Sequence, residues 1–249
     1  MFGDTGVYAT VAAAFAIAAV AFVGWSLADR RHRRIYGFAV ATACLVMAAA
    51  NALLAAEGVT TVSLDAVSHE EVRFAGYVVA FGIVAWTLAS VAGASRIQTG
   101  LLVAVVCALP ASTLAVSALS RSTDGVGQAL AFVFLSVAVF LLVGPIGRAA
   151  SEVSDHRRLL FGKLRTLSVF GWTVLAAVGL LSVESIGILD PFATIFLYSY
   201  LELLLLVGVG ALLVGHSAAL DDVDGRDSVG ADTPEPAVVD DTPIEIEAS

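Results

Sequence analysis

The chain has 249 residues, of which 59% are hydrophobic and 14% charged, and its mean hydropathy is +0.91. So much apolar sequence excludes an ordinary soluble domain and is typical of an integral membrane protein. The net charge of −9 belongs to the end of the chain: from residue 216 onward there are ten acids and one arginine, whereas the part before it has twelve acids and twelve bases. We therefore expect a lipid bilayer around the body of the protein and no nucleic-acid partner.

Seven apolar runs, each long enough to cross a bilayer, predict transmembrane helices at about 5–28, 35–56, 72–92, 99–119, 127–146, 166–183 and 191–215. The predicted fold class is all-α, because backbone groups inside lipid must be satisfied within their own segment. Residues 1–216 are thus expected to form a seven-helix membrane bundle. The sequence also predicts a long polar connection, 147–165, before the sixth helix.

Basic residues predict the orientation of this bundle. Ten Lys or Arg residues fall on the side of the first, third and fifth connections, against Arg73 and Arg121 on the other side. Positive charge accumulates on the cytoplasmic side, so we expect a multi-pass protein of the cell membrane with its N-terminus outside and its C-terminus in the cytoplasm. Residues 217–249 are acidic and lack apolar periodicity, which predicts a disordered cytoplasmic tail. Its Asp221-Asp222-Val223-Asp224 cluster is better explained by solvation than by metal binding.

No pattern in the chain predicts an enzyme or a metal site. Cys44 and Cys107 lie in apolar runs without a second cysteine or a histidine at ligand spacing. No Ser-His-Asp set, nucleotide-binding loop or pair of intramembrane aspartates is present either.

Glu202 is the one ionisable side chain of the seventh run, and an acid at this depth marks a candidate functional position. Tyr198, Ser199 and Leu206 share its helix face, and the first two are expected to hydrogen-bond the carboxyl group. Without a nearby cation, burial would keep Glu202 protonated. The competing structural interpretation is a neutral acid that links two helices.

Arg73, at the start of the third run, has two interpretations: an anchor that reaches the membrane interface, or part of an internal polar path. A bundle with one buried base and one buried acid favours the second. We therefore expect Arg73 to meet Glu202 through water.

These features together resemble the microbial (type I) rhodopsin family, particularly its haloarchaeal opsins. The resemblance covers about residues 5–215 and rests on an arginine opening the third helix, a tryptophan in the sixth and an acid in the seventh. The run FGKLRTLSVFGW, which ends at Trp172, is similar to the family's entry into its sixth helix. LELLLLVGVG, 201–210, is similar to the family's Asp-x-x-x-Lys followed by Gly-x-Gly.

At several positions this chain differs from the pattern of the family that it resembles. Leu206 stands where the family has the lysine that forms the retinal Schiff base, and the sole lysine of the chain is Lys163. Glu202 matches the second counter-ion, but Gly76 replaces the primary acceptor aspartate and Thr87 stands at the proton-donor position. Further differences lie along the retinal pocket, where Tyr77 and Gly179 replace two clamping tryptophans and Phe81 and Gly82 replace Thr and Pro.

The resemblance therefore implies a bundle without covalent retinal and without light-driven pumping. Two functions follow from it: a regulatory or interaction role in the membrane, for which the family suggests an enzyme of carotenoid synthesis or a homo-oligomer as partner, or a sensory protein that holds a carotenoid or retinal non-covalently. Space freed by Gly76 and Gly179 motivates the second, with closure by neighbouring side chains as the alternative. An intramembrane enzyme or proton-linked transporter is the weakest hypothesis, because Glu202 lacks a partner base.

Overall fold

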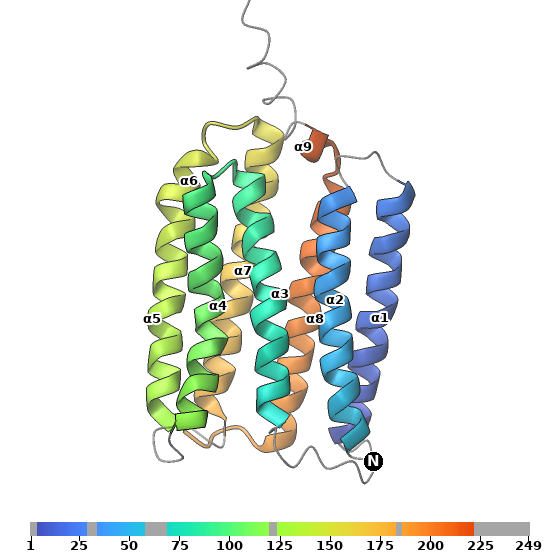
Figure 1. The fold of residues 1–249 in the computed structure, drawn as a ribbon, viewed down its shortest axis with the longest axis vertical. Helices are drawn as coiled ribbons and strands as arrows, with labels where there is room; N and C mark the ends of the chain where they lie inside the picture. The colour runs from blue at the N-terminus through green and yellow to red at the C-terminus, as the bar shows by residue number, and fades with distance from the viewer. Residues whose placement is uncertain (1–3, 29–33, 58–68, 120–123, 183–185, 222–249) are drawn as a thin grey trace, which may run out of the picture.

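The structure is a computed structural model that describes residues 4–28, 34–57, 69–119, 124–182 and 186–221. Seven helices in it are long and apolar enough to span a membrane, and they stand side by side in one bundle (Figure 1). They are α1 (Asp4–Ala28), α2 (Arg34–Glu57), α3 (His69–Ala92), α4 (Arg96–Leu119), α5 (Asp124–Val143), α7 (Asp155–Leu181) and α8 (Pro191–Gly215). Two short helices, α6 (Pro145–Ala149) and α9 (Ala218–Asp221), lie at one end of the bundle.

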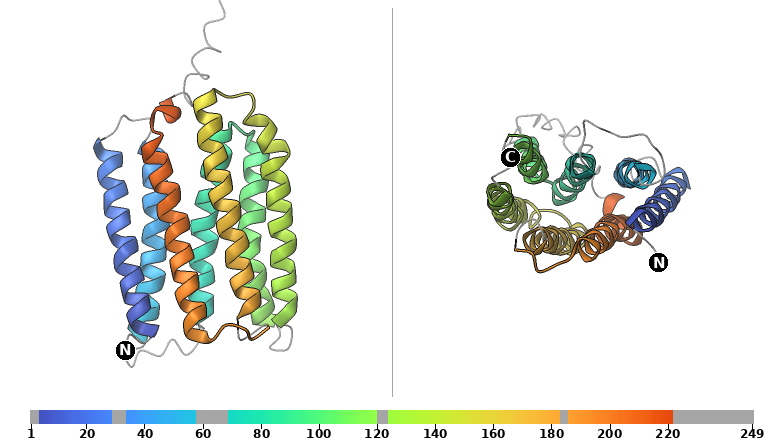
Figure 2. Two further views of the ribbon diagram at one scale, coloured as in Figure 1. Left: turned by 180° about the vertical axis from the view of Figure 1, so that it is seen from behind. Right: turned by 90° about the horizontal axis from the view of Figure 1, so that it is seen from below.

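Consecutive spans are neighbours, and α8 returns to pack between α7 and α1 (Figure 2). The chain therefore follows a closed ring of helices, with α3 making the additional contacts with α7 and α8 that fill the middle. All regular structure in the described residues is helical, which confirms the predicted all-α seven-helix class.

The predicted start of the sixth helix was wrong. α7 starts at Asp155, eleven residues before the predicted 166, so the long connection expected at 147–165 is mostly helix. Leu160, Phe161 and Leu164 are buried in the core although charged residues lie among them. Helical periodicity with charges on the outer face explains why a search for apolar runs missed this segment.

The fifth predicted helix, 127–146, is divided near its end. α5 stops at Val143 and α6 begins at Pro145, whose ring supplies no backbone N–H and is favoured in the first turn of a new helix. The predicted end at 146 was therefore too late for one continuous helix.

The seventh predicted helix coincides with α8, and its start has a clear local cause. Asp190 caps it by accepting a hydrogen bond from the Ala193 backbone N–H at 2.8 Å, and Pro191 occupies the first turn. The cap satisfies one of the free N–H groups of the first turn and aligns α8 as it enters the bundle.

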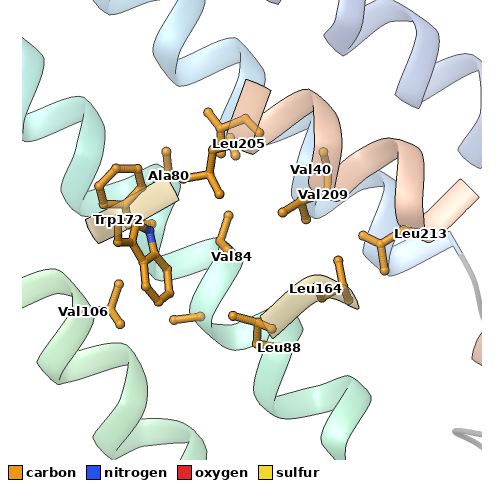
Figure 3. Close-up of a cluster of buried hydrophobic side chains, with 14 of the residues drawn as sticks. Val40, Ala80, Val84, Leu88, Val106, Leu164, Trp172, Leu205, Val209 and Leu213 are labelled. Carbon is orange, nitrogen blue, oxygen red and sulfur yellow. The ribbon is translucent and has the colours of Figure 1, made fainter. Parts of the chain in front are cut away.

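Apolar side chains from five helices close the half of the bundle that follows Glu202 along α8 (Figure 3). In this view Trp172 lies near Ala80 and Val84, and Leu88 approaches Leu164. Ser168 Oγ and Trp172 Nε1, both buried, have no hydrogen-bond partner among the described residues. Apart from these two atoms, the side chains labelled in Figure 3 are apolar and buried.

The predicted boundary between bundle and tail at 216/217 was too early. Ala219 and Leu220 are buried, and α9, which holds them, packs against α7. The rest of the predicted disordered tail, 222–249, lies outside the described residues.

Candidate functional site

The two charged residues of the predicted site form a direct ion pair. Arg73, in the second turn of α3, is 8% exposed, and Glu202, near the middle of α8, is fully buried. Arg73 Nη2 lies 2.7 Å from Glu202 Oε1, and Arg73 Nε donates to the same oxygen at 2.8 Å. Arg73 thus points into the bundle, which decides against the interface anchor.

Direct contact also corrects the expectation that water would mediate this pair. The expected protonation of Glu202 was conditional on the absence of a cation, and the structure places the guanidinium beside it. Both charges are removed from water at once, an arrangement that is tolerated only when the two groups compensate each other.

Hydrogen bonds extend the pair to a cluster of four side chains. The Tyr77 hydroxyl, one turn after Arg73 on α3, donates a hydrogen bond to Glu202 Oε1. Ser199 Oγ, on α8, accepts from Arg73 Nη2 at 3.1 Å. Tyr77, predicted as a pocket residue, therefore belongs to the polar cluster. Ser199 was expected to hydrogen-bond the Glu202 carboxyl group, but it accepts from Arg73 instead.

Two aromatic rings flank the guanidinium. The Tyr198 ring centroid lies 5.1 Å from Arg73 Cζ, and the Tyr8 centroid, contributed by α1, lies at 5.8 Å. Such contacts between a cation and an aromatic face are favourable in a desolvated setting. The Tyr198 ring thus stabilises the ion pair through its contact with the Arg73 guanidinium.

The donors around Glu202 are unevenly distributed. Arg73 and Tyr77 both approach Oε1, whereas Oε2 is buried without a hydrogen-bond partner among the described residues. Asn51 is fully buried on α2, and its Oδ1 also has no hydrogen-bond partner among the described residues. Its Nδ2 donates to the Met47 carbonyl at 2.9 Å. The cluster therefore keeps unused acceptor capacity.

The positions next to this cluster are closed by packing. Leu206, one turn beyond Glu202, is 1% exposed. A Cβ added at Gly76 would meet Met47 Sδ at 3.2 Å and Ala50 Cβ at 3.4 Å, so α2 already occupies the space beside this glycine. Gly76 acts as a contact between α2 and α3.

Aromatic side chains fill the space between α3 and α7. The Tyr77 and Phe81 rings are stacked with centroids 5.0 Å apart, and Phe81 lies 6.1 Å from Trp172. A cavity of about 40 Å³ remains beside them, lined from α4 and α5 by residues such as Thr113 and Gln128. A cavity of that volume accommodates water, whereas ligand pockets have about 300–1,000 Å³.

The space beside Gly179, the second glycine expected to leave room for a ligand, is also filled. A Cβ at this position would come within 2.6 Å of Tyr198 Oη and 3.2 Å of Gln128 Oε1. Gln128 is held there by donating from Nε2 to the Ala176 carbonyl at 2.8 Å. The interpretation that neighbouring side chains close this space is the one that the structure favours.

The residues at the α9 end do not connect to the cluster. Thr87, at the proton-donor position, is buried and donates to the Ile83 carbonyl at 2.9 Å. Lys163 Nζ lies 2.8 Å from His216 Nε2, next to the last turn of α8. No group of three or more His, Cys, Asp or Glu residues in the described parts of the chain is arranged to hold a metal ion.

Sequence reasoning missed Tyr8, Asn51 and Gln128. Tyr8 and Asn51 stand among alanines and other apolar residues of the first two helices, and Gln128 is a single amide near the start of α5. A polar side chain inside a membrane helix is itself a signal, which applied to Asn51 and Gln128. Tyr8 carried no signal, because its partner is 65 residues away along the chain.

Seven spanning helices around a buried Arg–Glu pair define a multi-pass membrane protein. A model of the "Bacteriorhodopsin-like protein" family matches residues 4–220, which is most of the chain. The chain therefore belongs to the bacteriorhodopsin-like family.

Individual relatives agree with this assignment. Sensory rhodopsin-2 of Natronomonas pharaonis is 34% identical over 102 residues, a match that covers 41% of this chain and 43% of that protein. Bacteriorhodopsin-II of Haloarcula marismortui is 23% identical over 202 residues, covering 78% and 80% of the two chains.

Solved structures show the same fold at low identity. The thermophilic rhodopsin of Rubrobacter xylanophilus superimposes with a TM-score of 0.80 at 20% identity, over 90% of this chain and 100% of that one. Halorhodopsin, described as a light-driven chloride pump, gives a TM-score of 0.75 at 18% identity, over 87% and 97% of the chains.

Proposed function

We propose that this chain is a retinal-free member of its family that does not pump ions with light and that acts by contacting another membrane protein. The observation that carries the proposal is Leu206, buried one turn after Glu202 at the position of the family's retinal lysine. A Schiff base requires a primary amine, and leucine has none.

The remaining lysine does not substitute for the missing one. Lys163 lies beside His216, fourteen residues after Glu202, which corresponds to about 21 Å along a helix. Its amine is separated from the polar cluster by the apolar half of the bundle, where Leu205, Val209 and Leu213 are buried. A pigment attached at Lys163 would leave the family's chromophore position empty.

The ion pair supports the same proposal. In the absence of a Schiff base, Arg73 supplies the positive charge next to Glu202, so the pair needs no ligand to balance it. Moving a proton through Glu202 would break this pair and leave the guanidinium buried without its counter-ion, which is strongly unfavourable. We assign the pair a structural role.

Packing argues against the alternative, a non-covalent carotenoid or retinal receptor. The cavity of about 40 Å³ is too small for such a molecule, and widening it would require Tyr198 and Gln128 to leave the space beside Gly179. Non-covalent binding of a carotenoid or retinal is the alternative outcome of the experiment described below.

For the partner, the family resemblance suggests a membrane enzyme of carotenoid synthesis. We also propose the N-out, C-in orientation, since the described basic residues Arg34, Arg96 and Arg148 are on helix ends that the topology brings to the α9 side. Contacts with such an enzyme would use lipid-facing surfaces or this basic side.

The test is purification of the tagged chain from a carotenoid-containing host, with an absorption spectrum before and after all-trans retinal is added. We expect no visible band, no light-driven pH change in the intact cells, and co-purification of another membrane protein. A band in the wild-type chain that is lost in Tyr198→Ala would support the receptor instead. A colourless chain that brings down no partner contradicts the interaction role.

A further inference from the structure

We propose that the hydrogen bond between Lys163 and His216 is a pH-sensitive contact that holds α9 against the bundle while His216 is neutral and releases α9 when His216 is protonated. Lys163 Nζ, on α7, lies 2.8 Å from Nε2 of His216, the residue that caps the C-terminus of α8. His216 Nδ1 lies 3.0 Å from the carbonyl oxygen of Leu212, one turn earlier. The histidine ring therefore connects the ends of two membrane helices.

The two partners of the ring determine which of its protonation forms fits. The Leu212 carbonyl oxygen can only accept, so Nδ1 carries a proton and donates to it. The Lys163 ammonium can only donate, so Nε2 accepts through its lone pair. A neutral imidazole has one donor and one acceptor nitrogen, which satisfies both partners. In the imidazolium both nitrogens donate, so protonation places an N–H and a second positive charge against the ammonium.

Histidine changes its charge between pH 5 and 8, so this contact is present at the upper end of that range and is lost as the pH falls. Among the described residues the His216 ring hydrogen-bonds only Leu212 and Lys163, and no acid forms an ion pair with it. The halves of α1, α3 and α8 nearest α9 carry no charged residue. The other charged or titratable residues that α2, α7 and α9 bring to this end are Arg34, Asp155, His156, Arg157, Arg158, Arg165 and Asp221.

The contact affects α9 because this helix begins directly after His216 (Figure 1). The Ala219 N–H donates to the His216 carbonyl at 2.9 Å, and the Leu220 N–H donates to the Ser217 carbonyl at 3.0 Å. Both α9 side chains are buried, at 3% and 1% exposed, and α9 packs against α7, the helix that carries Lys163.

The length of α9 makes it dependent on this attachment. A helix of four residues is not stable in isolation, so α9 persists only through its packing on the bundle. Loss of the bond between α7 and the residue before α9 weakens that packing. Acidification therefore exposes the apolar side chains of Ala219 and Leu220 at this end of the protein.

Hydrogen exchange of the full chain in lipid nanodiscs tests the proposal. The exchange of the Ala219 and Leu220 amides is measured at pH 8 and pH 5.5 and divided by the intrinsic rate at each pH. We expect the corrected exchange to be about 2-fold to 13-fold faster at pH 5.5, as for the loss of one hydrogen bond. Equal corrected exchange at the two pH values overturns the proposal.

Three variants assign the effect to this contact. In His216→Gln the amide oxygen still accepts from Lys163 but does not titrate, so we expect slow exchange at both pH values. Lys163→Met leaves the ring intact and removes its donor, so exchange should be fast at both. His156→Gln, at an exposed histidine of α7, is the matched control and should keep the wild-type response.

A pH response that persists in His216→Gln or Lys163→Met, or that disappears in His156→Gln, refutes the assignment. The Lys163→Met result decides the question if His216→Gln fails to accumulate. These measurements involve neither retinal nor a partner protein, so this proposal and the proposed function fail separately.

Discussion

Replacing the buried ion pair in steps tests the central feature of this bundle. Arg73→Met leaves the Glu202 carboxyl group buried without its cation, and Glu202→Leu leaves the guanidinium without its anion. Removing one partner of a buried pair costs about 3–5 kcal/mol of unfolding free energy. The double variant removes both charges together, and such apolar replacements are often neutral or stabilising by about 1–4 kcal/mol. We therefore expect the double variant to be more stable than either single one.

The measurement is equilibrium unfolding in mixed micelles, followed by helix circular dichroism, for the wild type, both single variants and the double variant. Arg158→Met, at an exposed arginine, is the control for the loss of a charge as such. Tyr77→Phe removes one hydrogen bond to the same oxygen and should cost about 1.5–3 kcal/mol. Additive effects of the two single variants, with no coupling between them, would refute the direct pair.

The remaining predictions concern the pocket, the helix contacts and the helix ends. Leu206→Lys should stay colourless with retinal, because the space beside Gly179 is closed and the remaining cavity of about 40 Å³ is too small for retinal, and a stable visible band would contradict this packing. Gly210→Ala should lower the unfolding free energy by about 1–3 kcal/mol, because its Cβ would collide with the Phe22 ring; Gly24→Ala, with open space, should be neutral or stabilising, and equal effects would argue against the α1–α8 contact. Arg157→Gln should cost about 1.5–3 kcal/mol in the same assay, because this buried side chain donates to the carbonyls that end α3, whereas Arg158→Gln should have little effect.

The space beside Gly179 shows a limit of the sequence. The sequence left two interpretations open: space freed by Gly76 and Gly179, or closure of that space by neighbouring side chains. In the structure Tyr198 and Gln128 occupy the space beside Gly179 and close it. A list of substitutions shows what each position has lost, but the volume that its neighbours take up depends on their rotamers.

Arg157 illustrates a similar limit. Its sequence context indicates a cytoplasmic loop charge, equivalent to Arg158. In the structure Arg157 is 4% exposed and donates to the Ser90 and Val91 carbonyls at 3.1 Å and 3.3 Å. Adjacent residues on a helix point in different directions, so the rotation of α7 against α3 decides which arginine is buried.

By itself the sequence determined that the chain crosses the membrane seven times, that Glu202 is buried in the seventh helix, and that no amine stands at Leu206. These conclusions depend on hydrophobicity summed over 20 or so residues and on the chemistry of single side chains, and neither requires knowledge of distant contacts. The tertiary structure alone decided that Arg73 reaches Glu202 directly and that Tyr77 and Tyr8 join the cluster. The reason is physical: hydrogen bonds and burial depend on helix rotation and on partners 65 to 129 residues apart, and local sequence carries neither.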